Sequence, residues 1–280
     1  MSMSDALHDE TWWITGASSG IGEAIATAIA AQGARLILSG RNLDELARVA
    51  EACGKERCLI LPFEATDYAA IPRLVNAAIE WAGRINCLVN NAGISQRSLA
   101  IDTDFSVYDQ IIAIDLLAPI ALTQALLPHM VKQGGGQLIA ISSVAGIIGA
   151  PMRSAYSAAK HGIFGYFDSV RCETAHLGMS VLVVAPGSIK TNVSRNALSA
   201  DGTSRGESDA AIEAGMLPSD AASAIIDAVA NGTRELILAE GAEDYLAHLR
   251  RSDPNKLFDR LAASVKAGYA EKMAANMTAL

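Results

Sequence analysis

The chain has 280 residues, 51% of them hydrophobic and 19% charged, which allows one large domain or two small ones with an ample core. Its formal net charge is −8 and it holds no cluster of Lys and Arg, which argues against nucleic acid or an anionic membrane as a partner. No apolar run reaches the ~18–20 residues of a membrane span, and the polar, acidic N-terminus is unlike a signal peptide. The four cysteines and five histidines show no metal-ligand spacing, so we expect free thiols, no metal and a cytoplasmic location.

Short β-favouring runs alternate with helical patterns along most of the chain. Strands are predicted at 11–15, 35–40, 57–63, 86–93, 137–143, 180–187 and 234–239. Helices are predicted at 16–33, 42–53, 66–83, 104–134, 154–178 and 219–232. This alternation predicts an α/β fold: a single Rossmann-type doubly wound domain over 11–240, whose seven-stranded parallel sheet carries helices on both faces.

Three segments fall outside this alternation. Residues 1–10 are predicted to be a flexible N-terminus. Residues 188–217 are rich in Gly, Ser, Asp and Asn, and we expect a substrate lid that orders on binding. Residues 241–280 are helical and charged, with a break at Pro254, and predict a helical C-terminal extension.

A glycine-rich turn, Gly16 to Gly22, joins the first strand to the first helix. Glycines let the backbone approach a pyrophosphate, and a helix N-terminus offers free N–H groups. The spacing Gly-x-x-x-Gly-x-Gly differs from GxGxxG. The alternative is a glycine-rich turn that binds no ligand. The position of Gly16 to Gly22 between a strand and a helix favours a dinucleotide site.

The end of the second strand bears on the choice of dinucleotide. A carboxylate about 20 residues after the glycines binds the ribose 2′-OH of NAD(H), but here Gly40 lies 20 residues after Gly20 and Arg41 follows it. A guanidinium can pair with a 2′-phosphate, and Ser18 can add a hydroxyl. This favours NADP(H), with NAD(H) as the alternative; the plainer interpretation of Arg41 is a solvated loop residue.

Ser143, Tyr156 and Lys160 form a candidate catalytic group. Lys160 lies one helical turn after Tyr156 and shares its face. A lysine ammonium beside a phenol favours the phenolate, so the tyrosine can exchange a proton with an alcohol or carbonyl oxygen. The hydroxyl of Ser143 can hold the same oxygen. The alternative is an ordinary amphipathic helix with a solvated lysine.

In these residues the chain resembles the short-chain dehydrogenase/reductase family, and most of all its hydroxysteroid-dehydrogenase-like carbonyl reductases. The resemblance covers about residues 11–240 and rests on TGASSGIG at 15–22, NNAG at 90–93, Ser143, YSAAK at 156–160 and PGSIKT at 186–191. It implies that Tyr156 is the general acid/base, that Ser143 holds the substrate oxygen, and that Lys160 binds the nicotinamide ribose. Some relatives carry an N-terminal membrane anchor; with about ten residues before the first strand, we expect none here.

The resemblance, together with the position of Arg41 described above, gives a set of cofactor-binding residues. These are Gly16, Ser18, Ser19, Gly20, Ile21 and Gly22 on the pyrophosphate and adenosine side, Arg41, Glu64 and Ala65 near the adenine end, Asn91, Ala92 and Gly93 in the cleft, Tyr156 and Lys160, and Pro186, Gly187, Ile189 and Thr191 on the carboxamide side. Glu64 stands where many relatives have Asp.

One position departs from the family pattern. The family usually has Asn in the long helix, whereas this chain has Asp115 four residues before Pro119, which is itself a candidate bend. The Asn is thought to hold a water that leads from the lysine to solvent, and Asp can accept such a hydrogen bond. Asp115 would also bring a negative charge near Lys160 and move the pH optimum. The alternative is an ordinary helix Asp.

The sequence predicts an oxidoreductase that uses NADP(H) on a carbonyl or secondary alcohol. An apolar substrate pocket is suggested by Ile94, Ile147, Ile148, Met152, Leu198 and Met216, several of which can instead be core residues. Arg97, Arg153 and Arg195 can bind an acidic group, although solvated arginines are more common. The helix at 154–178 is apolar on several faces, which with the resemblance suggests a homodimer or homotetramer. A nucleotide-binding regulator without catalysis remains the alternative of a different class.

Overall fold

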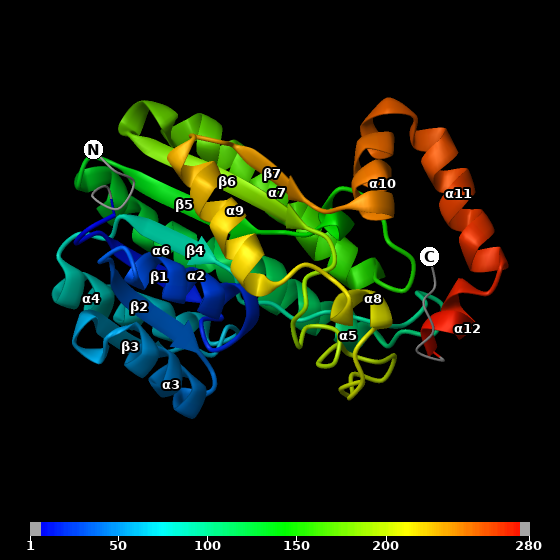
Figure 1. Ribbon diagram of the computed structural model, residues 1–280, viewed down its shortest axis with the longest axis horizontal. Coiled ribbons are helices and arrows are strands. Elements are labelled where there is room, and N and C mark those ends of the chain that lie inside the picture. Colours follow the sequence, from blue (N-terminus) through cyan, green and yellow to red (C-terminus); the bar gives the residue numbers. More distant parts are fainter. Residues whose placement is uncertain (1–6, 275–280) are drawn as a thin grey trace.

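The computed structural model describes residues 7–274, and the strands among them form one parallel sheet in the order β3-β2-β1-β4-β5-β6-β7 (Figure 1). The strands are β1 (Thr11–Thr15), β2 (Arg35–Gly40), β3 (Cys58–Pro62), β4 (Cys87–Asn90), β5 (Gly136–Ile141), β6 (Met179–Pro186) and β7 (Glu235–Leu238). All neighbours pair in parallel. The predicted seven-stranded parallel sheet is therefore confirmed.

Helices cover both faces of the sheet, as predicted (Figure 1). One face carries α2 (Gly20–Ala30), α3 (Leu43–Cys53) and α9 (Pro218–Ala230). The other carries α4 (Ile71–Ala82), α6 (Ala118–Lys132) and α7 (Ser154–Thr174), and α5 (Phe105–Ile112) packs against α7. The remaining helices are α8 (Ala210–Glu213), α10 (Gly241–Ser252), α11 (Pro254–Lys266) and α12 (Tyr269–Ala274), with 3₁₀ turns at Lys55–Arg57, Tyr68–Ala70, Val144–Gly146 and Ala175–Leu177.

The first strand shows how the two helical layers are held. Successive side chains of a strand point to opposite faces, so Trp12 enters the core beneath α2 and Trp13 the core beneath α4 and α6. Both are 1% exposed. Each indole N–H has a partner: Glu10 accepts from Trp12 at 3.0 Å and Ser39 from Trp13 at 2.9 Å. β1 is thus a central strand buried on both faces.

The strand order reverses between β1 and β4, because β2 and β3 follow on one side of β1 and β4 to β7 lie on the other. β1 and β4 pair at Ile14 and Val89. Connections leave these two strands toward opposite faces, so their carboxyl ends border a crevice, where ligands bind in open α/β sheets. The glycine-rich turn follows β1 and Asn91 follows β4.

The predicted helix over 104–134 is continuous but irregular. Ala113–Leu117 forms a π-helical turn (η3) between α5 and α6. Pro119 has no N–H to donate to the carbonyl of Asp115, four residues earlier, which favours a wider turn there. The bend expected at Pro119 therefore takes the form of a π turn that contains Asp115.

Helix ends differ from the sequence-based ranges by a few residues. The glycine turn delays the start of α2 to Gly20, and the 3₁₀ turn at 68–70 delays α4 to Ile71. Asn42 caps α3 by accepting a hydrogen bond from the backbone N–H of Glu45 at 3.2 Å.

The segments outside the alternation have defined contacts. Of the predicted flexible N-terminus, residues 1–6 lie outside the described residues, and Asp9 pairs with Arg57 at 2.8 Å. The predicted lid holds α8 and otherwise irregular backbone. The C-terminal extension forms α10, α11 and α12 at one end of the sheet, with the predicted break at Pro254 (Figure 1); its residues 275–280 lie outside the described residues.

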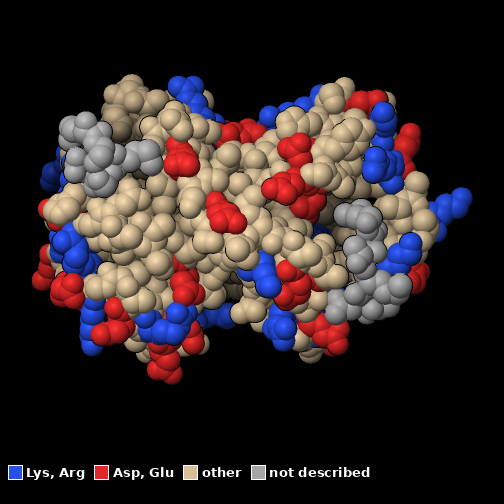
Figure 2. All heavy atoms as spheres, in the orientation of Figure 1, with Lys and Arg blue, Asp and Glu red and all other residues tan. Residues whose placement is uncertain are grey.

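One helix meets the length and composition of a membrane span, contrary to the expectation that no such run exists. Residues Phe105–Lys132 have a mean hydropathy of 1.8 over an 18-residue window, of which 44% is buried within the protein. Leu122, Leu126 and Met130 of this helix pack in the core against the sheet. Charged side chains of both signs are interspersed on the face that Figure 2 shows.

Candidate functional site

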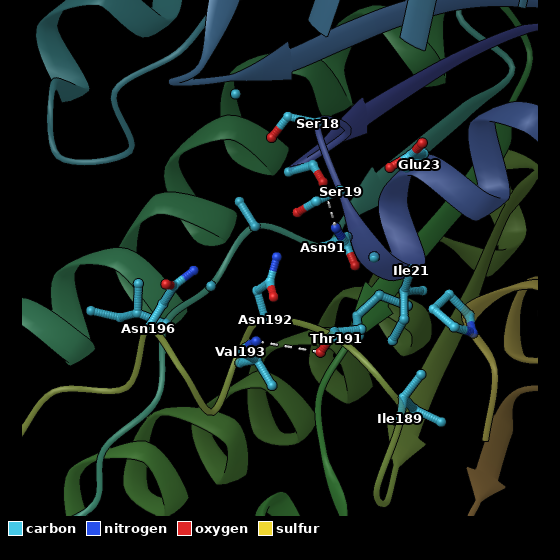
Figure 3. A pocket seen from close by; sticks show the side chains of 18 of the residues that line it. Ser18, Ser19, Ile21, Glu23, Asn91, Ile189, Thr191, Asn192, Val193 and Asn196 are labelled. Carbon is cyan, nitrogen blue, oxygen red and sulfur yellow. Dashed lines mark hydrogen bonds between the residues drawn. The ribbon is translucent and has the colours of Figure 1, made fainter. Parts of the chain in front are cut away.

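A cleft of about 1760 Å³ opens along the carboxyl ends of β1 to β6. Every candidate catalytic and cofactor residue predicted above lines it except Gly22. Figure 3 shows Ser18, Ser19 and Asn91 on one side of the opening and Thr191, Asn192 and Val193 on the other. The fold thus brings together residues that are up to 175 positions apart, from Gly16 to Thr191.

The glycine turn has the geometry of a phosphate cradle. Gly16 and Gly20 adopt φ values of +66° and +60°, a region that favours glycine. A Cβ on Gly22 would stand 2.4 Å from the carbonyl oxygen of Gly16, so Gly22 packs beneath the turn and does not line the cleft. Ser19 precedes α2 without a side-chain capping bond. Its hydroxyl and the first N–H groups of α2 are available to an anion.

Thr15, which sequence reasoning did not single out, ties the two crevice loops together. Its hydroxyl donates to the carbonyl of Val89 at 3.2 Å and accepts from the backbone N–H groups of Asn91 and Ala92 at 3.0 and 3.1 Å. The side-chain amide of Asn91 donates to the carbonyls of Thr15 and Gly16 at 3.0 and 3.2 Å. Asn91 therefore shapes the glycine turn from across the crevice.

Arg41 lies exposed at the rim of the cleft, and the structure gives it no hydrogen bond or ion pair among the described residues. Ser18 lines the same end. Arg48 also lies there but is neutralised by Glu23 at 2.8 Å and Glu45 at 2.7 Å. Arg41 is thus the arginine at this end whose charge is available to a ligand.

The other wall of this end comes from the segment after β3. Phe63 and Ala65 are buried and line the cleft, together with Ile114 of η3. Glu64 accepts hydrogen bonds from the backbone N–H and the hydroxyl of Thr66 at 3.4 and 3.3 Å. Phe63 and Ile114 were missed from the sequence, although each directly precedes a residue that had been singled out.

Ser143 begins the 3₁₀ turn after β5. Its Oγ accepts from the backbone N–H of Ala145 at 3.1 Å and donates to the carbonyl of Pro186 at 3.3 Å. The hydroxyl is thereby held at the junction of the β5 and β6 loops and faces the cleft.

Tyr156 and Lys160 lie one turn apart in the first half of α7, as predicted. The Lys160 Nζ lies 5.6 Å from the centre of the Tyr156 ring and donates to the carbonyl of Ile141 at 3.1 Å. Gly146 lets α7 approach: a Cβ there would stand 2.7 Å from the carbonyl of Lys160. The ammonium therefore has a fixed place behind the phenol.

Asp115 forms a buried ion pair with Lys160, with 3.2 Å between Oδ2 and Nζ. Its other oxygen accepts from the backbone N–H of Ile94 at 2.8 Å. The two side chains are 0% and 5% exposed. A Cβ on Gly93 would lie 2.8 Å from Asp115 Oδ2, so the glycine of NNAG makes room for the carboxylate.

The two members of this pair have altered pKa values. Burial has the largest single effect on the pKa of Lys160 and lowers it, but the carboxylate of Asp115 and then Tyr156 together outweigh burial and raise the pKa above the ordinary 10.5. Burial raises the pKa of Asp115 above the ordinary 3.8, against the effect of Lys160. The structure thus places a negative charge directly against the candidate catalytic lysine.

The expected apolar substrate pocket is only partly present. Ile94 and Leu198 line the cleft, but Ile147 and Ile148 are buried under the C-terminal extension and Met216 packs against the core beneath α2 and α9. Met152, with φ at +61°, does not line the cleft. Polar side chains from α5 and the predicted lid share this end of the cleft: Gln110, Asn192, Asn196, Ser204 and Glu213.

The three arginines considered as anion ligands do not line the cleft. Arg97 is buried and pairs with Asp209 at 2.6 Å. Arg153 lies 3.7 Å from the same carboxylate, and Arg195 is exposed. The first two serve an ion cluster within the fold.

A family model described as short chain dehydrogenase matches residues 10–202. The chain is 36% identical over 268 residues to "Dehydrogenase/reductase SDR family member 7B" of Xenopus tropicalis, covering 93% of this chain and 87% of that protein. It is 38% identical over 204 residues to "Dehydrogenase/reductase SDR family member 7" of Homo sapiens, covering 70% and 60%.

Two solved structures share the fold. A short-chain dehydrogenase from Streptomyces avermitilis superposes with a TM-score of 0.73 at 28% identity, covering 95% of this chain and 96% of that one. A short-chain dehydrogenase/reductase from Burkholderia phymatum, solved in complex with NAD, gives a TM-score of 0.77 at 20% identity, covering 88% and 94%.

Proposed function

Since the chain belongs to the short-chain dehydrogenase family and is an oxidoreductase, we propose that it interconverts a carbonyl compound and its secondary alcohol with NADP(H). One observation carries the proposal. Ser143, Tyr156 and Lys160 line the same cleft as a glycine turn whose geometry suits a pyrophosphate.

The residues present fit a dinucleotide. Gly16, Gly20 and the N-terminus of α2 would hold the pyrophosphate, and Phe63 and Ile114 would flank the adenine. When bound, the nicotinamide supplies the hydride for carbonyl reduction, or accepts it in alcohol oxidation.

The protein's own groups handle the proton. In reduction Tyr156 gives its phenolic proton to the substrate oxygen. In oxidation the Tyr156 phenolate takes the hydroxyl proton of the alcohol. Ser143 holds that oxygen by a hydrogen bond. Lys160 stabilises the phenolate, and Asp115 keeps the lysine charged in its buried position.

The preference for NADP(H) rests on Arg41 and Ser18 at the adenosine end, because a guanidinium pairs with a 2′-phosphate. We expect Arg41→Asp to shift the ratio of kcat/KM for NADPH over NADH by about tenfold or more toward NADH. Arg48→Gln is the matched control, since the charge of Arg48 is already neutralised. An unchanged ratio in Arg41→Asp contradicts this assignment.

For the substrate we propose an apolar ketone or secondary alcohol. Ile94 and Leu198 support this, and the polar side chains of Asn192 and Asn196 lie on the same lining. A panel of aliphatic, aromatic and steroid ketones, followed by absorbance of the reduced nicotinamide, identifies the preferred class.

The test of the function is Tyr156→Phe beside Tyr166→Phe. Tyr166 lies on the same helix, is half-buried and makes no side-chain hydrogen bond among the described residues. We expect Tyr156→Phe to lose turnover by about a hundredfold or more while it still binds nucleotide, and Tyr166→Phe to retain turnover. Equal activity of wild type and Tyr156→Phe would contradict the mechanism, and nucleotide binding without turnover in wild type would favour a regulator.

We also propose that the protein is a homo-oligomer in the cytoplasm. Phe105 is 75% exposed and Leu117 44% exposed along the α5–α6 helix, which supports pairing with a second copy. Cys53, Cys58, Cys87 and Cys172 are all free thiols, as a reducing compartment allows. Light scattering of the purified protein measures the oligomer size.

A further inference from the structure

The C-terminal extension reaches the cofactor loop through one carboxylate. Glu243, in the first turn of α10, accepts hydrogen bonds from both groups of Ser188: from the backbone N–H at 2.7 Å and from the hydroxyl at 3.1 Å. Ser188 lies between Gly187 and Ile189, two residues for which we propose cofactor contacts. A Cβ on Gly187 would stand 2.2 Å from Glu243 Oε2, so the loop and the carboxylate are in close contact.

The loop that Glu243 holds has few other attachments. Gly187 N donates to the carbonyl of Leu238 at the end of β7, and Ser188 and Lys190 exchange backbone hydrogen bonds with Met216. Glu243 supplies the side-chain bonds to this stretch from outside the sheet. Hydrogen bonds to a charged acceptor are stronger than neutral ones, so its loss frees the loop more than loss of a neutral contact would.

The same helix supports the catalytic serine from its apolar side. Leu246 and Leu249 of α10 pack in one cluster with Val144, Ile147 and Ile148, which lie within five residues after Ser143. Ser143 also donates to the carbonyl of Pro186, next to Gly187. α10 therefore contacts both loops that converge on the proposed hydride-transfer end of the cleft.

We propose that Glu243 is a positioning residue for the nicotinamide cofactor. By binding Ser188 it fixes the loop of residues 187–191 so that Ile189 and Thr191 meet the carboxamide. This assignment rests on the proposed use of that loop by the cofactor. It makes the C-terminal extension a part of the cofactor site.

The experiment measures the Kd of the full-length protein for NADP+ and for NAD+ by calorimetry, with cofactor KM and kcat alongside. We expect Glu243→Ala to raise the preferred nucleotide's Kd about tenfold or more, and its KM by more than kcat falls. Glu243→Gln keeps a carbonyl acceptor for the Ser188 N–H and should stay within about threefold of wild type. Glu240→Gln, an exposed residue at the same helix end, should change nothing.

Two outcomes overturn the assignment. One is a Glu243→Ala protein that loses thermal stability but binds nucleotide as wild type does. The other is an equal loss of affinity in Glu240→Gln. If Glu243→Ala does not fold, Glu243→Met, which keeps the side-chain length and removes both acceptors, must show the same loss of affinity. A wild type that binds neither nucleotide contradicts the proposed function itself, whereas normal wild-type binding with unaffected variants contradicts only the role of Glu243.

Discussion

Two buried carboxylates, Asp115 in the catalytic region and Asp209 in the predicted lid, are neutralised in different ways. Among the residues that the structure describes, Asp115 has one ionic partner, Lys160, and both are held by secondary structure that packs in the core. Asp209 has three: Arg97, Arg153 and Arg205. The first arrangement carries no net charge, and the second carries an excess of positive charge.

The excess alters the acid–base behaviour of the lid cluster. Burial raises the pKa of Asp209, but the guanidinium groups of Arg97 and then Arg205 outweigh it and hold the pKa below 3.8. Burial, and then the neighbouring Arg153, lowers the pKa of Arg97 to about 10.

The two regions also differ in what they connect. Arg97 follows β4 and Arg153 precedes α7, whereas Arg205 and Asp209 belong to the predicted lid, and Arg205 donates to the carbonyl of Met273 in α12 at 2.8 Å. A one-to-one pair thus serves a fixed site, while a shared carboxylate joins segments distant in the sequence.

The largest effect is expected from removing the carboxylate of the one-to-one pair. Asp115→Ala leaves the ammonium of Lys160 buried without a counter-charge and should lower the free energy of unfolding by about 3–5 kcal/mol. Denaturant unfolding measures it. Asp109→Ala, at an exposed position of the same helix, is the control; equal losses in the two variants would show that Asp115 and Lys160 are not coupled.

A smaller effect is expected in the shared cluster. Asp209→Asn keeps an acceptor oxygen, and Arg153 and Arg205 are partly exposed, at 21% and 13%, so water takes up part of their charge. We expect a loss of about 1–3 kcal/mol, with faster hydrogen exchange in residues 194–209. Glu207→Gln, an exposed lid residue, should leave exchange unchanged; if it matches Asp209→Asn, the cluster does not hold the lid.

The two regions should respond to pH at opposite ends of the scale. The pKa of Asp209 in the folded protein lies below the ordinary 3.8. The stabilisation from Asp209 is therefore complete above pH 3.8 and is lost as the pH falls through the lower, folded-state pKa. Because the pKa of Lys160 is raised, its contribution is complete below pH 10.5 and is lost as the pH rises through the folded value. Because the pKa of Asp115 is raised in the folded protein, protonation of Asp115 on acidification does not lower the stability of the fold.

Amide hydrogen exchange, measured in the two regions as a function of pH and corrected for intrinsic rates, tests these opposite pH responses. Acid should accelerate exchange first in residues 194–209, and alkali first near residues 111–118. An acid response that is identical in wild type and Asp209→Asn would contradict the assignment to Asp209.

The last expected effect is on catalysis, in the pH dependence of Asp115→Asn. The amide keeps an acceptor for the N–H of Ile94 but removes the charge beside Lys160. This change of charge beside Lys160 should move the pH–rate profile of alcohol oxidation. A profile that matches wild type would mean that Asp115 has no electrostatic role in catalysis.

Patterns close together in the sequence predicted most of the fold. The alternation of apolar runs and amphipathic segments predicted the seven parallel strands, because a strand buried on both faces is largely apolar, as Leu36, Ile37 and Leu38 of β2 show. The candidate site followed from the same logic, since the carboxyl ends of parallel strands meet at one edge. The lid and the N-terminal boundary remain predictions.

The substrate wall was the part least predictable from sequence. Ile147 and Ile148 were expected to face a substrate, but α10, about a hundred residues later in the chain, covers them. Apolar character alone does not distinguish a pocket wall from a packed core, because both exclude water.

Periodicity and short-range spacing were enough to predict the parallel α/β fold, the glycine turn and the candidates Ser143, Tyr156 and Lys160, which lie within 18 residues of one another. The three-dimensional contacts were not predictable in this way: Asp115 pairs with Lys160, Thr15 joins two loops, three arginines share Asp209, and Glu243 holds Ser188. Apart from Arg205 and Asp209, which are four positions apart, these contacts join residues 45 to 112 positions apart in the sequence. Charge and hydrogen bonding act over a few ångströms in space, and separation along the chain does not reveal which groups the packing of sheet and helices brings within that range.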